Sequence, residues 1–187
     1  MRETILSLWI APDTSKLAKS IYEYLKLKQD AIIYYIDSVN SFPLNELREI
    51  TSVNDNTIFE RIHIVTCLDL VELKRTIMKI TEDPRNNNCK IMIHGIDTMM
   101  NNSRIQISNQ DQVYSILNNI LLQLRINYKG SLLITGPRLK KRRIERNKNN
   151  KNNFNHNNNT SGNDGSHNML MNDVIEYINR FYCDDVV

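Results

Sequence analysis

The densest group of residues able to do chemistry is a basic run, RLKKRRIER, over residues 138–146. Between Arg138 and Lys151 the sequence holds eight Lys or Arg against one Glu, a local charge of +7. The formal net charge of the whole chain is only +3, so everything outside this stretch carries −4. Like charges in a block repel one another unless a polyanion neutralises them, which favours nucleic acid first and an acidic membrane surface second.

Four adjacent cations form the centre of the run, and two arginines flank it. The central residues are Lys140, Lys141, Arg142 and Arg143, with Arg138 and Arg146 on either side. Neutralising about four phosphates would give a log–log salt slope near −3 to −4 and would need no recognition of bases. A short Lys/Arg-rich run supports nuclear import equally well, and one run can serve both purposes. We therefore predict DNA contact and a location in the nucleus, with the cytoplasm as a second compartment.

The phosphate-binding loop of nucleotide-hydrolysing proteins is degenerate in this chain. Its pattern, G-x-x-x-x-G-K-[ST], falls on IAPDTSKL, where Ile10 and Ser15 stand at the glycine positions and Leu17 at the hydroxyl position. The glycines let backbone N–H groups curl around a phosphate, and the hydroxyl binds magnesium. Lys16 is the one match, and a solvated lysine in the first turn of a helix explains it as well.

Other catalytic or metal-binding patterns are also missing. KIMIHGID puts His94 at the strand end where an acidic residue would position magnesium, and Asp97 three residues later has no evident task without a phosphate loop. The three cysteines and four histidines lack the spacing of a zinc site. The apolar run at the N-terminus is too short for a signal sequence or a membrane span. We predict an intracellular soluble protein with no cofactor, no metal and no membrane partner, and these patterns give catalysis no support without excluding it.

Apolar runs alternate with helical patterns along the chain. Short runs rich in Ile, Leu and Val predict strands buried on both faces at Thr4–Ile10, Ala31–Ile36, Arg61–Val65, Lys90–Ile93 and Ser131–Ile134. Apolar steps of three and four predict helices around Leu17–Leu25, Leu70–Ile80 and Val113–Leu124. Asp69 and Glu72 resemble a capping box, and Pro43 suits the first turn of a short helix. The alternation indicates an α/β fold with a mostly parallel sheet flanked by helices.

The sequence divides into a core, an insertion and a C-terminal helix. The core spans residues 1–146 and includes the basic loop at 138–146. Residues 147–168 hold eleven asparagines in 22 positions, which predicts a disordered Asn-rich insertion. In residues 169–187 an apolar stripe of Leu170, Val174, Ile178 and Phe181 predicts a helix that docks back on the core.

The order of several short motifs resembles a known family. The matching stretches are Ile36-Asp37 with Ser41-Phe42-Pro43-Leu44, Thr66-Cys67-Leu68-Asp69-Leu70 with Glu72-Leu73, the helix end at Leu124-Arg125, the basic run and the final helix around Glu176–Tyr182. Together they resemble a RecA-like (P-loop NTPase-type) core whose phosphate loop has decayed, and more closely the RecA-like DNA-binding subunits of the Shu complex. The resemblance covers nearly the whole chain apart from the Asn-rich insertion.

The resemblance implies a non-catalytic DNA-binding subunit that promotes recombinase filament assembly in homologous recombination repair and error-free damage tolerance. Its implied partners are single-stranded or forked DNA, a sister RecA-like subunit (platinum sensitivity protein 3) in a heterodimer, other Shu complex subunits and the recombinase-paralogue heterodimer. The family's DNA-contacting residues fall on Lys140, Lys141, Arg142 and Arg143.

The family's aromatic contact to the recombinase-paralogue heterodimer falls on Phe42. Packing of Phe42 at the start of a helix is the alternative. Two other functions stay open for the chain as a whole: a structural adaptor whose basic run serves only import, and a small degenerate NTPase.

Overall fold

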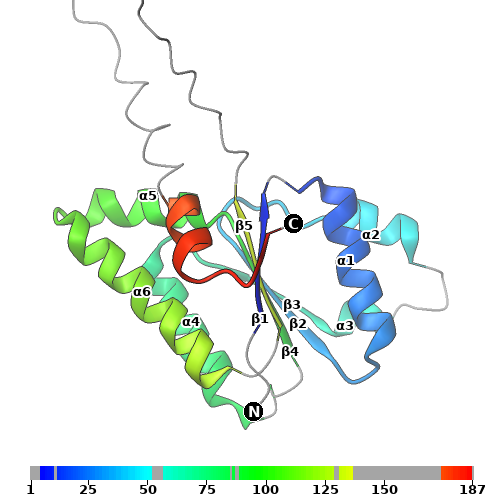
Figure 1. The fold of residues 1–187 in the computed structure, drawn as a ribbon. Helices are drawn as coiled ribbons and strands as arrows, with labels where there is room; N and C mark the ends of the chain where they lie inside the picture. The colour runs from blue at the N-terminus through cyan, green and yellow to red at the C-terminus, as the bar shows by residue number, and fades with distance from the viewer. Residues whose placement is uncertain are drawn as a thin grey trace, which may run out of the picture.

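The computed structural model describes residues 5–10, 12–51, 57–84, 86, 89–128, 131–136 and 174–186. Six parallel strands form one sheet in the order β3-β2-β4-β5-β1-β6. Their bounds are β1 (Ile5–Ile10), β2 (Ile32–Asp37), β3 (Ile62–Thr66), β4 (Cys89–His94), β5 (Ser131–Gly136) and β6 (Asp185–Val186). Figure 1 shows the sheet edge-on between two layers of helices. This confirms the predicted α/β fold, which is consistent with a RecA-like core.

Seven helices of the described chain flank the sheet. Three lie on one face, α1 (Thr14–Leu27), α2 (Leu44–Ile50) and α3 (Thr57–Glu60). The other face carries α4 (Leu70–Glu82), α5 (Ile96–Gln106), α6 (Gln110–Asn127) and a C-terminal helix over 174–181. The predicted apolar stripes of α1, α4 and α6 face the sheet, because their Leu, Ile and Val residues are buried.

Strand alternation splits the core into two clusters. Leu6, Leu8 and Ile36 point toward α4, α5 and α6, whereas Ile33 and Tyr35 point toward α1 and α2. The edge strand β3 departs from the prediction of burial on both faces, since Ile64 is 52% exposed. An edge strand has one neighbour instead of two, and fewer side chains cover it.

Local capping explains where α4 begins. The Asp69 carboxylate accepts the N–H groups of Val71 and Glu72 at 2.8 and 2.9 Å. Glu72 in turn accepts the N–H of Leu68 at 2.7 Å, one residue before the position that a standard capping box uses. Asp69 and Glu72 therefore cap the start of α4 as predicted, except that Glu72 accepts its hydrogen bond from Leu68 and not from Asp69.

The C-terminal helix packs on the face covered by α6. Val174, Ile175 and Ile178 are buried in the larger core cluster. Asn118 of α6 accepts hydrogen bonds from the hydroxyls of Tyr177 and Tyr182. Phe181, which the apolar stripe assigns to the buried side, is instead 58% exposed. Among the described residues, no helix combines the length and apolar character that crossing a membrane requires.

Candidate nucleic-acid interface

The carboxyl ends of the strands form one edge of the sheet, at the top of Figure 1. Strand register places Asp37, His94 and Thr135 side by side on β2, β4 and β5, with their side chains on the same face. β5 lies between β4 and β1 in the interior of the sheet. The basic run begins at Arg138, just after the last residue of β5, so the chain enters the run from the middle of this edge.

The six cations predicted to contact DNA lie outside the described residues. They are Arg138, Lys140, Lys141, Arg142, Arg143 and Arg146. Their role in DNA contact therefore stays a prediction, as does disorder in the Asn-rich insertion over 147–168. The structure describes the chain up to the end of β5 at Gly136, two residues before the run begins.

Asp37 shapes the loop that carries Phe42. The Asp37 side chain is 2% exposed and accepts the N–H groups of Val39 and Ser41 at 2.9 and 2.6 Å. Satisfying these two backbone donors turns the chain away from the end of β2. Phe42 is half-buried and packs edge-on against Tyr35, with ring centroids 5.0 Å apart. Packing of this aromatic is thus observed, while contact with a partner stays a prediction.

His94 is held as a half-buried, hydrogen-bonded side chain. Its Nδ1 lies 2.5 Å from Oγ1 of Thr135, and its ring lies 6.0 Å from that of Tyr35. Burial lowers the pKa of His94, and the carboxylates of Asp37 and Asp97 offset this in part. An imidazole bound to a threonine does not supply the oxygen ligands that magnesium prefers.

A glycine joins β4 to α5 at this edge. Gly95 has a φ of +80°, and a Cβ placed on it would lie 2.2 Å from Oγ of Ser38. The Ser38 hydroxyl donates to the Gly95 carbonyl at 2.7 Å and so ties the β2 and β4 ends together. Asp97 follows in the first turn of α5, where burial raises its pKa. Among the described residues, His, Cys, Asp and Glu do not gather in a group of three or more that could hold a metal.

The start of α1 carries a carboxylate where a phosphate loop would carry bare backbone. Asp13 is the N-cap, and its carboxylate accepts the N–H of Lys16 at 2.7 Å. The Lys16 ammonium lies 4.0 Å from the same carboxylate and is 73% exposed. The helix N-terminus attracts anions through its free N–H groups and dipole, and here Asp13 already occupies that position. A nucleotide phosphate would meet a negative charge.

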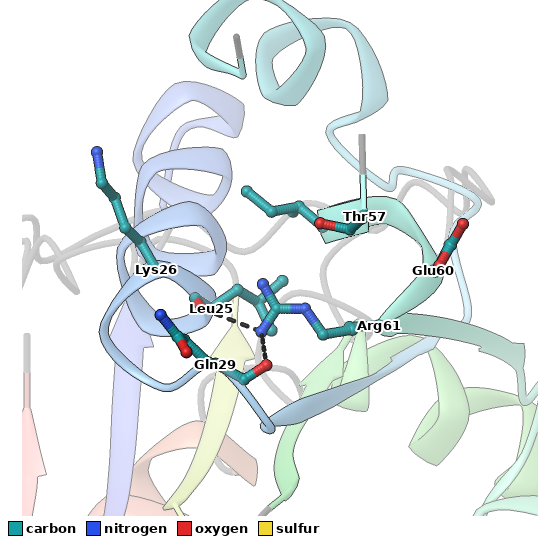
Figure 2. A pocket seen from close by; sticks show the side chains of 7 residues that line it. Leu25, Lys26, Gln29, Thr57, Glu60 and Arg61 are labelled. Carbon is teal, nitrogen blue, oxygen red and sulfur yellow. Dashed lines mark hydrogen bonds between the residues drawn. The ribbon is translucent and has the colours of Figure 1, made fainter. Parts of the chain in front are cut away.

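A cavity of about 440 Å³ lies at the opposite end of the strands, beside the end of α1 and the start of β3. Seven residues line it: Leu25, Lys26, Gln29, Thr57, Ile58, Glu60 and Arg61. Figure 2 shows the Arg61 guanidinium reaching from the end of α3 to the last turn of α1. Nη1 of Arg61 donates to the carbonyls of Leu25, Lys28 and Gln29 at 3.1, 3.0 and 2.7 Å. Arg61 therefore caps the C-terminal end of α1.

Sequence inspection did not assign site roles to Asp37 and Thr135. Asp37 is the last residue of β2 and Thr135 the last but one of β5, which is the available signal, since the carboxyl ends of neighbouring parallel strands meet at one edge. Their pairing with His94 depends on the strand order, in which β4 separates β2 from β5. The spacing of residues along the chain does not reveal this strand order.

Comparison with known proteins shows which family the chain is similar to. Residues 6–85, from β1 through α4 and including Phe42, match the model of a family described as "Shu complex component Csm2, DNA-binding". The chain is 28% identical to chromosome segregation in meiosis protein 2 of Candida glabrata, over 98% of this chain and 95% of that protein. It is 30% identical to the protein of the same name from Saccharomyces cerevisiae, over 65% of this chain and 66% of that protein.

Proposed function

Because this chain belongs to the Csm2 family of DNA-binding Shu complex components, we propose that it is a non-catalytic subunit that holds DNA and promotes recombinase filament assembly. The setting is homologous recombination repair and error-free damage tolerance in the nucleus. The subunit forms a heterodimer with the RecA-like platinum sensitivity protein 3 and meets the other Shu complex subunits and the recombinase-paralogue heterodimer. The observation that supports the proposal most is the basic run that follows β5, an interior strand of a RecA-like sheet.

DNA contact in this proposal is made by the basic run that follows β5 in the sequence. Lys140, Lys141, Arg142 and Arg143 bind backbone phosphates, with Arg138 and Arg146 adding to the local field. Phosphate contacts of this kind are insensitive to base sequence, which suits a protein that must act wherever DNA is damaged. Nuclear import through the same run is compatible with this role.

Absence of catalysis in this proposal rests on the start of α1. We expect no micromolar ATP binding by the purified protein, because the Asp13 carboxylate sits at the helix N-terminus and the glycines are missing. Isothermal titration with ATP and magnesium measures this directly. ATP binding with micromolar affinity that disappears in a Lys16→Ala variant would contradict the proposal and favour a degenerate NTPase.

Partner contact in this proposal involves the loop of Phe42. Val39 and Leu44, on either side of it, are 44% and 39% exposed, so the half-buried Phe42 ring lies in a partly apolar surface. Exposed apolar surface of this kind marks interaction sites more often than polar surface does. We therefore expect Phe42→Ala to impair capture of the recombinase-paralogue heterodimer.

The matched control for Phe42 is Phe59 in α3. Phe59 belongs to α3 and packs against the same core cluster as Phe42, so Phe59→Ala removes the same side chain from the same core. In a co-purification and recombinase-loading assay on single-stranded DNA, Phe42→Ala should lose both partner capture and loading. DNA affinity should be unchanged, and Phe59→Ala should behave as wild type. Equal losses in the two variants would mean that Phe42 acts through stability alone.

A further inference from the structure

Two lysine ammonium groups lie against one tyrosine ring near the end of α1. Nζ of Lys28 is 5.0 Å and Nζ of Lys90 is 5.1 Å from the centroid of the Tyr24 ring. Lys90 comes from β4, and its Nζ also bonds to Oγ of Ser20 on α1 at 3.4 Å. We call Tyr24, Lys28 and Lys90 the Tyr24 cluster. Lys28 is exposed and Lys90 half-buried, so one ammonium faces water while the other is held against the helix.

The Tyr24 cluster brings like charges together without a carboxylate. In the described part of the chain, the ion pairs are Lys16 with Asp13, Lys19 with Glu23, and Arg125 with Asp184. None of them includes Lys28 or Lys90. The ring offers partial compensation, because a cation is attracted to its face, but an aromatic ring does not neutralise two charges. Burial and then the nearby Lys28 ammonium lower the pKa of Lys90, as expected for repulsion without a counter-ion.

Capping of α1 does not explain Lys28. A lysine in the last turn of a helix commonly binds the free carbonyls there. In this chain Arg61 already donates to the carbonyls of Leu25, Lys28 and Gln29, as Figure 2 shows for Leu25 and Gln29. The Lys28 ammonium is directed to the Tyr24 ring instead. The positive charge of the cluster is therefore left available to a bound anion.

We propose that the Tyr24 cluster is a second DNA contact that binds a backbone phosphate between Lys28 and Lys90, and this rests on the DNA-binding function proposed above. The cluster lies near the amino end of β4, at the opposite end of the sheet from the carboxyl end of β5, after which the basic run follows. A six-residue strand spans roughly 20 Å at about 3.3 Å per residue. In B-DNA one strand advances about 3.4 Å per nucleotide and a single strand can extend further, so a segment of about six nucleotides is long enough to reach from the cluster to the carboxyl end of β5.

The test compares two double substitutions that remove the same charge. The variant Lys28→Gln/Lys90→Met disrupts the cluster while keeping the apolar stem of Lys90. The control Lys16→Gln/Lys19→Gln lies at the other end of α1, where both cations already face carboxylates. A labelled single-stranded oligonucleotide of mixed sequence is titrated with the full-length protein by fluorescence anisotropy, between about 50 and 300 mM salt.

We expect the cluster variant to reduce the log–log salt slope by roughly 1.5 and the affinity at about 100 mM salt roughly 10- to 50-fold. The control should keep the wild-type values. The melting temperature of the cluster variant should equal or exceed that of wild type, because two repelling charges are gone. Together these results would separate a binding role from a structural one.

Three outcomes overturn the inference. One is a slope and affinity equal to those of the control while wild type binds DNA normally. Another is a clear fall in melting temperature, which would make the cluster structural. The third is unchanged DNA binding with loss of a protein partner, which would assign the surface to an acidic protein. If wild type itself shows no salt-dependent DNA binding, it is the proposed function that fails.

Discussion

Binding of single-stranded DNA is expected to weaken roughly 10²- to 10³-fold at about 100 mM salt when four cations of the basic run are replaced together by glutamine. The four are Lys140, Lys141, Arg142 and Arg143. Each phosphate that a Lys or Arg neutralises releases a condensed counterion, and this release supplies most of the affinity of sequence-independent binding. Losing four such contacts therefore removes most of the interaction, while the fold of the core over the described strands and helices is untouched.

A charge-matched control distinguishes binding at the basic run from an effect of the overall net charge. Four cations outside the run, Lys16, Lys19, Lys74 and Lys79, are replaced by glutamine in the control, which shifts the net charge by the same amount. Fluorescence anisotropy with a single-stranded and a forked oligonucleotide measures both variants. If the control loses as much affinity as the basic-run variant, binding reflects overall charge and not a site. Normal DNA binding with loss of nuclear import would instead favour the adaptor function.

The second large effect concerns stability. We expect Ile178→Ala to lower the free energy of unfolding by about 2–5 kcal/mol, because it removes a fully buried side chain and leaves a cavity between the C-terminal helix and the sheet. Ile178 is 0% exposed within the larger core cluster. The helix is also tied to α6 by the hydroxyls of Tyr177 and Tyr182 on Asn118, and Asp184 accepts the N–H of Leu6 at 2.8 Å.

Phe181→Ala is the control for Ile178→Ala. Phe181 lies on the same helix and is 58% exposed, so its truncation should change stability by no more than about 0.5 kcal/mol. Urea denaturation followed by circular dichroism should show a lower midpoint for Ile178→Ala with an unchanged slope. Equal costs for the two substitutions would mean that the helix does not bury the face that the structure assigns to it.

Much of the fold follows from local patterns. The apolar runs and the steps of three and four give β1, β2, β4, β5, α1, α4 and α6 almost at their observed bounds. α5 is not predicted, although Ile96, Met99, Met100 and Ser103 are buried at helical spacing. Its mean hydropathy is lowered by two asparagines, and methionine is a weaker signal than leucine or isoleucine. The exposed face of β3 depends on its place at the edge of the sheet, which strand order decides.

The sites depend more on strand order than on local pattern. The basic run is visible in the sequence as a cluster of charges, but the interior position of β5, the strand that precedes it, depends on β5 lying between β4 and β1. The Tyr24 cluster is not visible at all, because Tyr24 and Lys90 come from different elements and meet only after β4 packs under α1. The apolar stripe predicts burial of Phe181 only if the core covers the whole apolar side of the helix. The core covers Val174 and Ile178 and leaves Phe181 exposed.

The salt dependence of DNA binding tests the central claim most directly. The whole chain, co-purified with the RecA-like partner proposed above, is titrated onto single-stranded DNA at several salt concentrations, as wild type and with the four central cations of the basic run replaced. We predict that the replacement reduces the wild-type log–log slope by about 3 to 4. A slope and affinity that do not change on replacement would contradict the account, because DNA contact would then not involve the basic run.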